Sequence, residues 1–185
     1  MKSPPKCRVT LCSALGQLSR RFYLKTENAI ILRILLLLEN GMPKINRSAL
    51  VPYSAEQMFK LVNDVPSYPA FLPGCTGSRV LSTSSEGMTA AVDVSKAGIS
   101  KTFTTRNTLT DNQSISMRLV DGPFRQLKGD WRFTPLSEEA CKVELDLDFE
   151  FKNALIELAF GKVFKELANN MVQAFTERAK EVYSA

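Results

Sequence analysis

The stretch Cys141-Lys-Val-Glu-Leu-Asp-Leu-Asp-Phe-Glu-Phe-Lys152 decides the fold class, because apolar and charged residues alternate along it without interruption. Successive side chains of a β-strand point to opposite faces of a sheet, so this stretch predicts a strand with one buried face and one solvent-exposed face. The strand before it shows the same pattern, with Leu127, Trp131 and Phe133 expected inward and Lys128, Asp130 and Arg132 outward.

A long amphipathic helix is expected directly after this strand, from about 153 to 182. Its apolar residues recur at three- and four-residue steps. They are Ile156, Phe160, Val163, Leu167, Met171, Ala174, Phe175 and Val182. The expected solvent side carries Glu157, Glu166, Asn169, Asn170, Gln173, Glu177 and Glu181. Gly161 inside the helix either softens it or permits a close approach by another element.

Upstream of these two elements the sequence predicts an antiparallel meander. Five alternating segments are separated by turn signals at 86–87, 97–98, 111–112, 121–123 and 137–139, and a less regular strand at 78–84 precedes them. A short strand at 45–51 ends at Pro52, and the capping-box spacing of Ser54 and Gln57 predicts a helix over 55–63. Three prolines in 64–74 exclude a long helix there. The fold class is therefore α+β, with a curved sheet wrapped around the last helix, a helix-grip arrangement.

Composition separates the chain at residue 41. Residues 1–41 hold seven of the 24 Lys and Arg and two of the 19 Asp and Glu, which leaves 17 of each in 42–185. The domain expected over 42–185 is therefore neutral, and does not favour RNA binding by bulk charge. The chain has no histidine and no CxxC pair among its four cysteines. We therefore expect no metal site, no catalytic residue and no enzyme activity.

Three interpretations remain for residues 1–41, an extension unlike the domain. The apolar run 29–38 contains Arg33 and has about half of the ~20 residues that a membrane span needs, so no transmembrane segment is expected. A secretory signal would need an earlier apolar region and a cleavage site. A mitochondrial transit peptide fits the basic, serine-containing segment 1–28, and would place the protein on the matrix side. The third interpretation, which we prefer, is that the start codon was assigned too far upstream. The cytoplasmic protein would then begin at Met42, because the regular pattern of strands and helices begins just after that residue.

Several separate blocks of the domain resemble one protein family. They are Val51-Pro-Tyr-Ser-Ala-Glu-Gln-Met-Phe-Lys-Leu-Val-Asn-Asp-Val65, Tyr68-Pro-Ala-Phe-Leu-Pro73 with Cys75, Gly122-Pro-Phe-Arg-Gln-Leu-Lys-Gly-Asp-Trp-Arg-Phe133 and Phe160-Gly-Lys-Val-Phe164. In order and spacing these blocks resemble the coenzyme-Q-binding branch of the START-like proteins, over essentially all of 42–185. The resemblance implies a helix-grip fold with a hydrophobic tunnel.

What the resemblance implies about function has two parts. Bacterial members bind the large ribosomal subunit, keep the small subunit from joining and act as toxins of toxin–antitoxin type systems, which implies an antitoxin partner that the residues do not identify. Eukaryotic relatives are tied to ubiquinone and respiration. No cofactor is required under either reading, although a ubiquinone or other lipid is a candidate for the tunnel. A cyclase activity, found elsewhere among START-like folds, ranks third.

The candidate tunnel lining is Phe71, Leu72, Val92, Val94, Phe103, Trp131, Phe133, Phe164 and Met171. Large aromatics on a buried strand face are also ordinary core residues, and this alternative stays open. The segment 68–73 is either the mouth of the cavity, a partner-binding corner, or a rigid turn that plugs the core.

The candidate ribosome contact is the set Arg125, Lys128 and Arg132, with Arg106 and Arg118 as further basic side chains able to touch RNA phosphates. Scattered surface arginine is usually only solvated. The acidic stripe Glu144, Asp146, Asp148 and Glu150 would repel RNA, serve a basic ribosomal protein, or keep the exposed strand face soluble.

Overall fold

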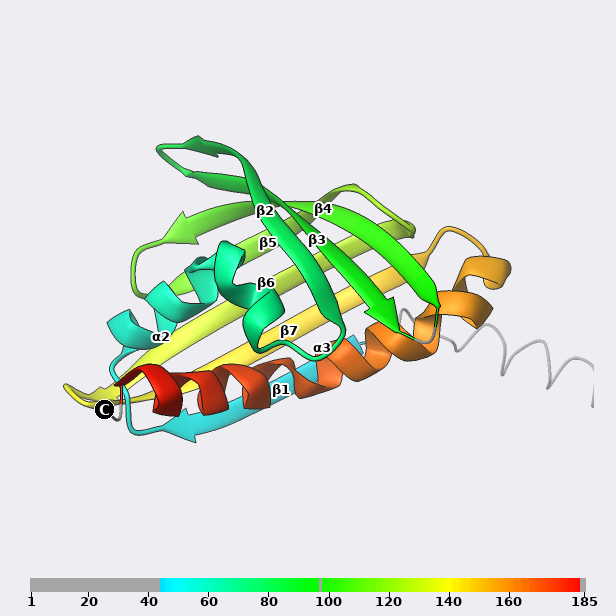
Figure 1. Ribbon diagram of the computed structural model, residues 1–185. Coiled ribbons are helices and arrows are strands. Elements are labelled where there is room, and N and C mark those ends of the chain that lie inside the picture. Colours follow the sequence, from blue (N-terminus) through cyan, green and yellow to red (C-terminus); the bar gives the residue numbers. More distant parts are fainter. Residues whose placement is uncertain (1–43, 97, 184–185) are drawn as a thin grey trace, which may run out of the picture. The chain divides into compact units, whose positions relative to one another are not determined.

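The structure, a computed structural model, describes residues 44–96 and 98–183. Seven strands, two α-helices and one 3-10 helix follow one another along these residues (Figure 1). In chain order they are β1 Lys44–Val51, α2 Ala55–Asn63, η1 Val65–Ala70, β2 Cys75–Ser84, β3 Gly87–Lys96, β4 Ile99–Thr110, β5 Ser114–Asp121, β6 Phe124–Ser137, β7 Ala140–Phe151 and α3 Ala154–Tyr183. The expected boundary at Met42 and the interpretations of residues 1–41 lie outside the described residues.

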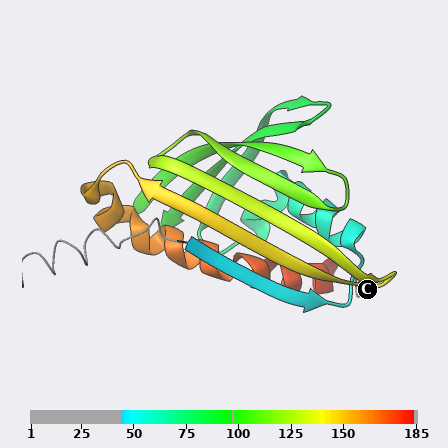
Figure 2. The same ribbon diagram turned by 180° about the vertical axis from the view of Figure 1, so that it is seen from behind.

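The strands form one antiparallel sheet in the order β1-β7-β6-β5-β4-β3-β2. The predicted meander is confirmed, since β2 to β7 pair in chain order, and β1 closes the sheet by pairing with β7 from Lys44↔Asp148 to Val51↔Cys141. The sheet curves around α3, and the view from behind shows its outer face in front of that helix (Figure 2). The fold is therefore the predicted helix-grip arrangement.

The alternation that predicted β7 is confirmed residue by residue. The odd-numbered side chains from Cys141 to Phe151 are buried against the interior, while the even-numbered ones from Lys142 to Glu150 are half-buried on the outer face. On β6, Trp131 and Phe133 are buried and Lys128 and Arg132 are exposed, as predicted. Burial of these large apolar surfaces is the main stabilisation of the domain.

Helix α3 lies along the inner face of the sheet. The predicted solvent side is confirmed, and ten of its residues are buried, among them Phe160, Phe164 and Phe175. The prediction for Val182 is wrong, because its side chain is 42 % exposed. The last turns instead direct Ala179 and Tyr183 toward the domain, and the Tyr183 hydroxyl donates a hydrogen bond of 3.1 Å to the Gln57 carbonyl oxygen.

Gly161 permits a close approach, the second of the two alternatives for this residue. A Cβ atom at this position would lie 3.4 Å from a ring carbon of Phe151 and 3.2 Å from Cγ of Glu157. The end of β7 therefore packs tightly against the second turn of α3.

Helix α2 begins at the predicted capping box. The Gln57 amide donates to Ser54 Oγ over 3.1 Å, and the Ser54 amide donates to Gln57 Oε1 over 2.8 Å. The following proline segment forms only the short 3-10 helix η1, which contains Pro69. The Tyr68 hydroxyl donates to the Val62 carbonyl oxygen and so fixes η1 against α2.

Candidate functional site

The nine side chains predicted to line a tunnel lie in the interior between the sheet and α3, in two apolar clusters. One cluster contains Leu72, Trp131 and Phe133, with Phe71 partly buried beside it. The other contains Val94, Phe103 and Phe164. Val92 and Met171 are partly buried and pack against both clusters. The structure therefore brings all nine to one interior, with Val92 and Met171 at the junction of its two halves.

Most of these aromatic side chains pack directly against other rings. The Trp131 ring contacts Phe175 edge to face with centroids 5.3 Å apart, and Phe103 contacts Phe164 in the same way at 5.8 Å. Such contacts stabilise the fold beyond area burial alone. These rings therefore stabilise the interior, and their role in lining a tunnel remains a prediction.

An opening lies beside this interior, where the proline segment meets α3 and the end of β3. Its cavity of about 290 Å³ is lined by Pro73, Gly74, Ser95, Lys96, Val163, Glu166, Leu167 and Asn170. Lys96 Nζ lies 2.5 Å from Glu166 Oε1, so an ion pair joins β3 to α3 at this opening. None of the nine predicted residues lines it, although Leu72, Val94 and Phe164 are sequence neighbours of residues that do. The end of segment 68–73 therefore lies at a cavity, and Phe71 also packs on the core.

A polar pair sits within the otherwise apolar inner face of the sheet. Thr105 and Asn107 are 5 % and 6 % exposed, and the Thr105 hydroxyl donates to Asn107 Oδ1 over 2.8 Å. Buried polar groups are usually hydrogen-bonded, and this bond satisfies the Thr105 donor within the apolar face. Sequence reasoning missed the pair, because β4 reads as a threonine-rich strand without a clear apolar face.

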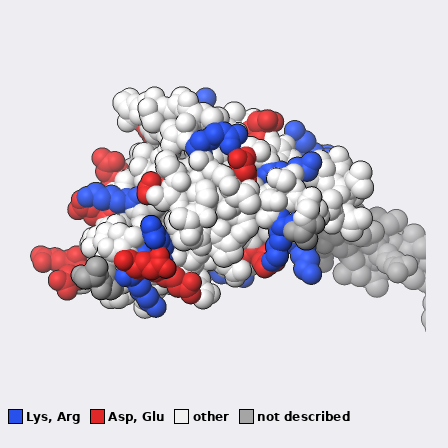
Figure 3. Space-filling model, viewed as in Figure 1, with Lys and Arg blue, Asp and Glu red and all other residues white. Residues whose placement is uncertain are grey.

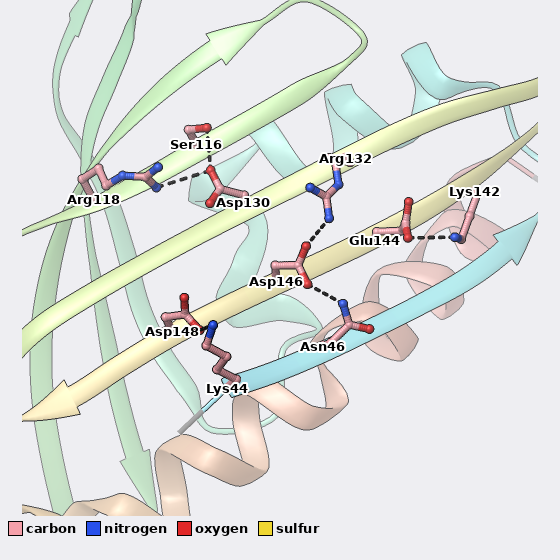
Figure 4. Close-up of polar contacts among 10 residues, drawn as sticks. All are labelled: Lys44, Asn46, Ser116, Arg118, Asp130, Arg132, Lys142, Glu144, Asp146 and Asp148. Atoms are coloured by element: carbon pink, nitrogen blue, oxygen red, sulfur yellow. Dashed lines mark hydrogen bonds and ion pairs between the residues drawn. The ribbon is translucent and has the colours of Figure 1, made fainter. Parts of the chain in front are cut away.

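The outer face of β6 carries the three predicted ribosome-contact residues. Arg125 and Arg132 form ion pairs with acids of the adjacent β7. Arg125 Nη1 lies 3.0 Å from Glu150 Oε1. Arg132 pairs with Asp146, as Figure 4 shows. Lys128 is exposed and has no ion pair with another described residue. The three residues thus share a face but differ in how far acids neutralise them.

The same close-up shows that three acids of the predicted stripe, Glu144, Asp146 and Asp148, have polar partners on β7 itself or on the adjacent strands (Figure 4). Asp146 accepts a hydrogen bond from Asn46, Asp148 lies 3.9 Å from Lys44 Nζ, and Glu144 lies 2.7 Å from Lys142 Nζ. By contrast, the middle of the helix-side view carries few charged residues, and its acids and bases gather toward the rim (Figure 3).

Neither described cysteine is an activated nucleophile. Burial raises the pKa of the Cys141 thiol to about 11 and also raises the pKa of Cys75, so both remain protonated and poorly nucleophilic near neutral pH. No group of three or more Cys, Asp or Glu within 44–96 and 98–183 could hold a metal ion. Within the same part of the chain, no helix is long and apolar enough to cross a membrane.

A curved antiparallel sheet that encloses a long C-terminal helix over an aromatic interior defines the helix-grip class of START-like proteins. A family model described as polyketide cyclase / dehydrase and lipid transport matches residues 51–176. The solved structure of the Zhui aromatase/cyclase from Streptomyces has a TM-score of 0.68 at 18 % identity, covering 78 % of this chain and 99 % of that one. At this identity the likeness shows the fold alone.

Two curated relatives refine this placement. The chain is 76 % identical over 150 residues to the ribosome association toxin RatA of Escherichia coli (strain K12), which covers 81 % of this chain and 95 % of that protein. It is 30 % identical over 142 residues to the mitochondrial coenzyme Q-binding protein COQ10 homolog B of Xenopus laevis, covering 75 % of this chain and 58 % of that one. The chain therefore belongs to the polyketide cyclase / dehydrase and lipid transport family, in the branch of RatA and the coenzyme Q-binding proteins.

Proposed function

We propose that this protein is a bacterial toxin that binds the large ribosomal subunit, keeps the small subunit from joining and so blocks the initiation of translation. The observation that carries the proposal is the 76 % identity to the ribosome association toxin RatA over 95 % of that protein's length. The proposal places the protein in the cytoplasm, where subunits join, and includes a protein antitoxin as a further partner.

Binding alone suffices for this function, since a domain that occupies part of the joining surface excludes the other subunit sterically. The rigid sheet provides a preformed surface, which lowers the entropic cost of association. The neutral charge of 42–185 means that contact with the ribosome depends on a local patch, on shape and on protein partners.

Sucrose-gradient profiles of a bacterial lysate test this proposal. Added protein is expected to reduce the peak of joined ribosomes, to increase both subunit peaks and to sediment with the large subunit. The matched control is the same lysate with an equal amount of an unrelated protein of similar size and charge. An unchanged profile, or sedimentation only with the small subunit, would contradict the proposal.

A second candidate function is the binding of a lipid quinone or a similar apolar ligand in the interior. It is favoured by the buried Thr105–Asn107 pair, which places polar groups within an otherwise apolar interior, and by the identity to the coenzyme Q-binding relative. Ligand sites of this kind are mostly apolar, with a few well-placed polar groups. The two functions do not exclude each other.

The single tryptophan provides the test of this second function. Trp131 is 1 % exposed within the interior, so ubiquinone bound there is expected to quench its fluorescence. Mass spectrometry of a solvent extract of the purified protein should then detect a copurifying lipid. If no lipid copurifies and ubiquinone leaves Trp131 fluorescence unchanged, the interior does not bind this ligand.

A further inference from the structure

Three basic side chains stand next to one another across the middle of the sheet. Arg106 on β4 lies directly opposite Arg118 on β5, and Arg118 lies directly opposite Lys128 on β6. All three are exposed, while the inward neighbours Thr105 and Asn107 of Arg106 are buried. We call Arg106, Arg118 and Lys128 the basic row; it lies on the outer face of the sheet.

The basic row is unfavourable for the isolated domain. Like charges directly opposite one another on neighbouring strands destabilise a sheet, because their Cβ atoms lie only ~5 Å apart. With strands ~4.8 Å apart, the row is ~10 Å long. An arrangement that costs stability on a solvent-exposed face indicates an anionic partner that offsets the cost when it binds.

Acidic side chains of the domain neutralise the basic row only in part. Arg118 Nη1 lies 3.3 Å from Asp130 Oδ1 and donates to the Met117 carbonyl oxygen. The side chains of Arg106 and Lys128 form no ion pair or hydrogen bond with another described residue, although the backbones of both belong to the sheet.

This distinguishes Arg106 from the other arginines. Seven arginines lie within the described residues, and six of them form an ion pair or a hydrogen bond. These six are Arg47, Arg79, Arg118, Arg125, Arg132 and Arg178. Arg106 is the seventh, and its guanidinium keeps its five donors available.

Hydroxyl groups continue the basic row toward β2. Thr89 on β3 lies directly opposite Arg106, and Ser82 on β2 lies directly opposite Thr89. Together with Arg106 they line a cavity of about 250 Å³. The remaining lining residues are Thr83, Ser84, Glu86, Gly87, Met88, Asn107 and Thr108, of which Glu86 is the one acid. A guanidinium beside several hydroxyl donors matches the oxygens of a phosphate group.

We propose that the basic row, with Ser82 and Thr89 at its end, is the surface that contacts the phosphate backbone of ribosomal RNA, an inference that rests on the proposed binding to the large subunit. Arginine, lysine and hydroxyl side chains together supply the usual donors to nucleic-acid phosphates. At the opposite end the row stops at Asp148, which lies opposite Lys128 on β7 and near Lys44. The RNA therefore crosses β4, β5 and β6 and leaves the paired charges of β7 and β1 aside.

The test compares two double variants that remove the same charge from the same face of the sheet. Arg106→Gln with Lys128→Gln removes the cations without an acidic partner. The control, Arg125→Gln with Arg132→Gln, removes the two members of the predicted contact set that ion pairs already neutralise and that this proposal leaves out of the contact. Arg118 is left in place because it also bonds to the backbone. Binding is measured by cosedimentation with purified large subunits at several salt concentrations, after thermal unfolding has shown that both variants are folded.

We expect the first variant to bind at least on the order of tenfold more weakly. Its salt dependence should flatten by about 1.4 to 1.8 in the slope of log K against log salt, because two phosphate contacts are lost. The control should change affinity by less than about threefold.

Each other outcome overturns a defined part of the account. If the parent binds and the two variants weaken binding equally, or neither weakens it, the basic row is not the contact and the proposed function stands. If the first variant binds more weakly with an unchanged salt slope, the row contacts something other than phosphates. If the parent does not bind large subunits at all, both the proposed function and this inference fail.

Discussion

The two faces of β6 and β7 are built from alternate residues of the same strands, yet they differ in almost every physical property. Trp131 and Phe149 on the inner face are 1 % and 0 % exposed and pack against other rings. Arg132 and Asp146 on the outer face pair with each other, and their side chains are 53 % and 37 % exposed. The inner face therefore holds the fold together, whereas the outer face carries charge that contributes little to stability.

Stability and partner binding are therefore separable in this domain. A substitution that creates a cavity acts on the inner face, while a substitution of an exposed charge leaves the packing unchanged. The outer face can therefore be altered to test binding without unfolding the domain.

Trp131→Ala should produce the largest loss of stability. Removing a buried aromatic side chain of this size costs about 3–5 kcal/mol, because the transfer free energy is lost and a cavity remains beside Phe133 and Phe175. Its outer-face neighbour provides the control, since Arg132→Ala should cost less than about 1 kcal/mol. Urea unfolding of both variants gives the two free energies, and similar losses would break the distinction between the faces.

Thr105→Val tests the polar exception on the inner face. The change removes the hydroxyl that donates to Asn107 Oδ1 and leaves the buried amide without this partner, which should cost about 1–3 kcal/mol. Changing Asn107 to Leu as well should recover much of this loss, because replacing both partners by apolar groups can be nearly neutral. Thermal unfolding of the single and double variants measures the coupling; additive losses would show that the pair does not act as a unit.

Ser54→Ala tests the N-cap of α2, a helix that packs on the interior and belongs to neither face of the sheet. The variant loses the capping bond from the Gln57 amide, and the free energy of unfolding should fall by about 1 kcal/mol. Ser54→Asp, which can still accept that bond, is the matched control and should stay within a few tenths of a kcal/mol of the parent. Equal losses in the two variants would mean that the cap bond does not stabilise α2.

Asp93→Asn should have the smallest effect on stability. Asp93 lies on the outer face of β3, next to the edge strand β2. Hydrogen bonds from Thr102 and then from Arg79 hold the pKa of this carboxyl below its usual value. Its stabilising contribution is therefore present above the pKa of the unfolded chain and is lost as pH falls through the lower pKa of the folded state. Melting temperatures of the parent and of Asp93→Asn should accordingly converge between neutral and acidic pH. A gap that stays constant over this range would contradict the assignment.

The sequence predicts the elements whose signals are local. Alternation along 141–152 and the spacing of Ser54 and Gln57 each act within one segment, so β7 and the capping box are readable without knowing the fold. The turns between strands follow for the same reason. Val182 was placed wrongly because apolar spacing alone does not show where the end of α3 leaves the core.

Features that depend on strand register could not be predicted. Arg106 and Arg118 were recognised only as scattered basic residues, because nothing local shows that β4 and β5 pair so as to place them opposite each other. The ion pairs that neutralise Arg125 and Arg132 likewise join β6 to β7 across the sheet. The buried pair Thr105 and Asn107 was missed because the threonine-rich sequence of β4 is typical of an exposed strand. Only the curvature of the sheet around α3 buries this face of β4.

Light scattering during the joining of purified ribosomal subunits tests the central claim most directly. If the protein is first mixed with large subunits, the rise in scattering on addition of small subunits should be suppressed in proportion to the occupied large subunits. If an equal, limiting amount of the protein is first mixed with small subunits and large subunits are then added, the early rise in scattering should be suppressed less. An unchanged rise in both orders, or stronger suppression after mixing with small subunits, would contradict the claim that this domain acts by binding the large subunit.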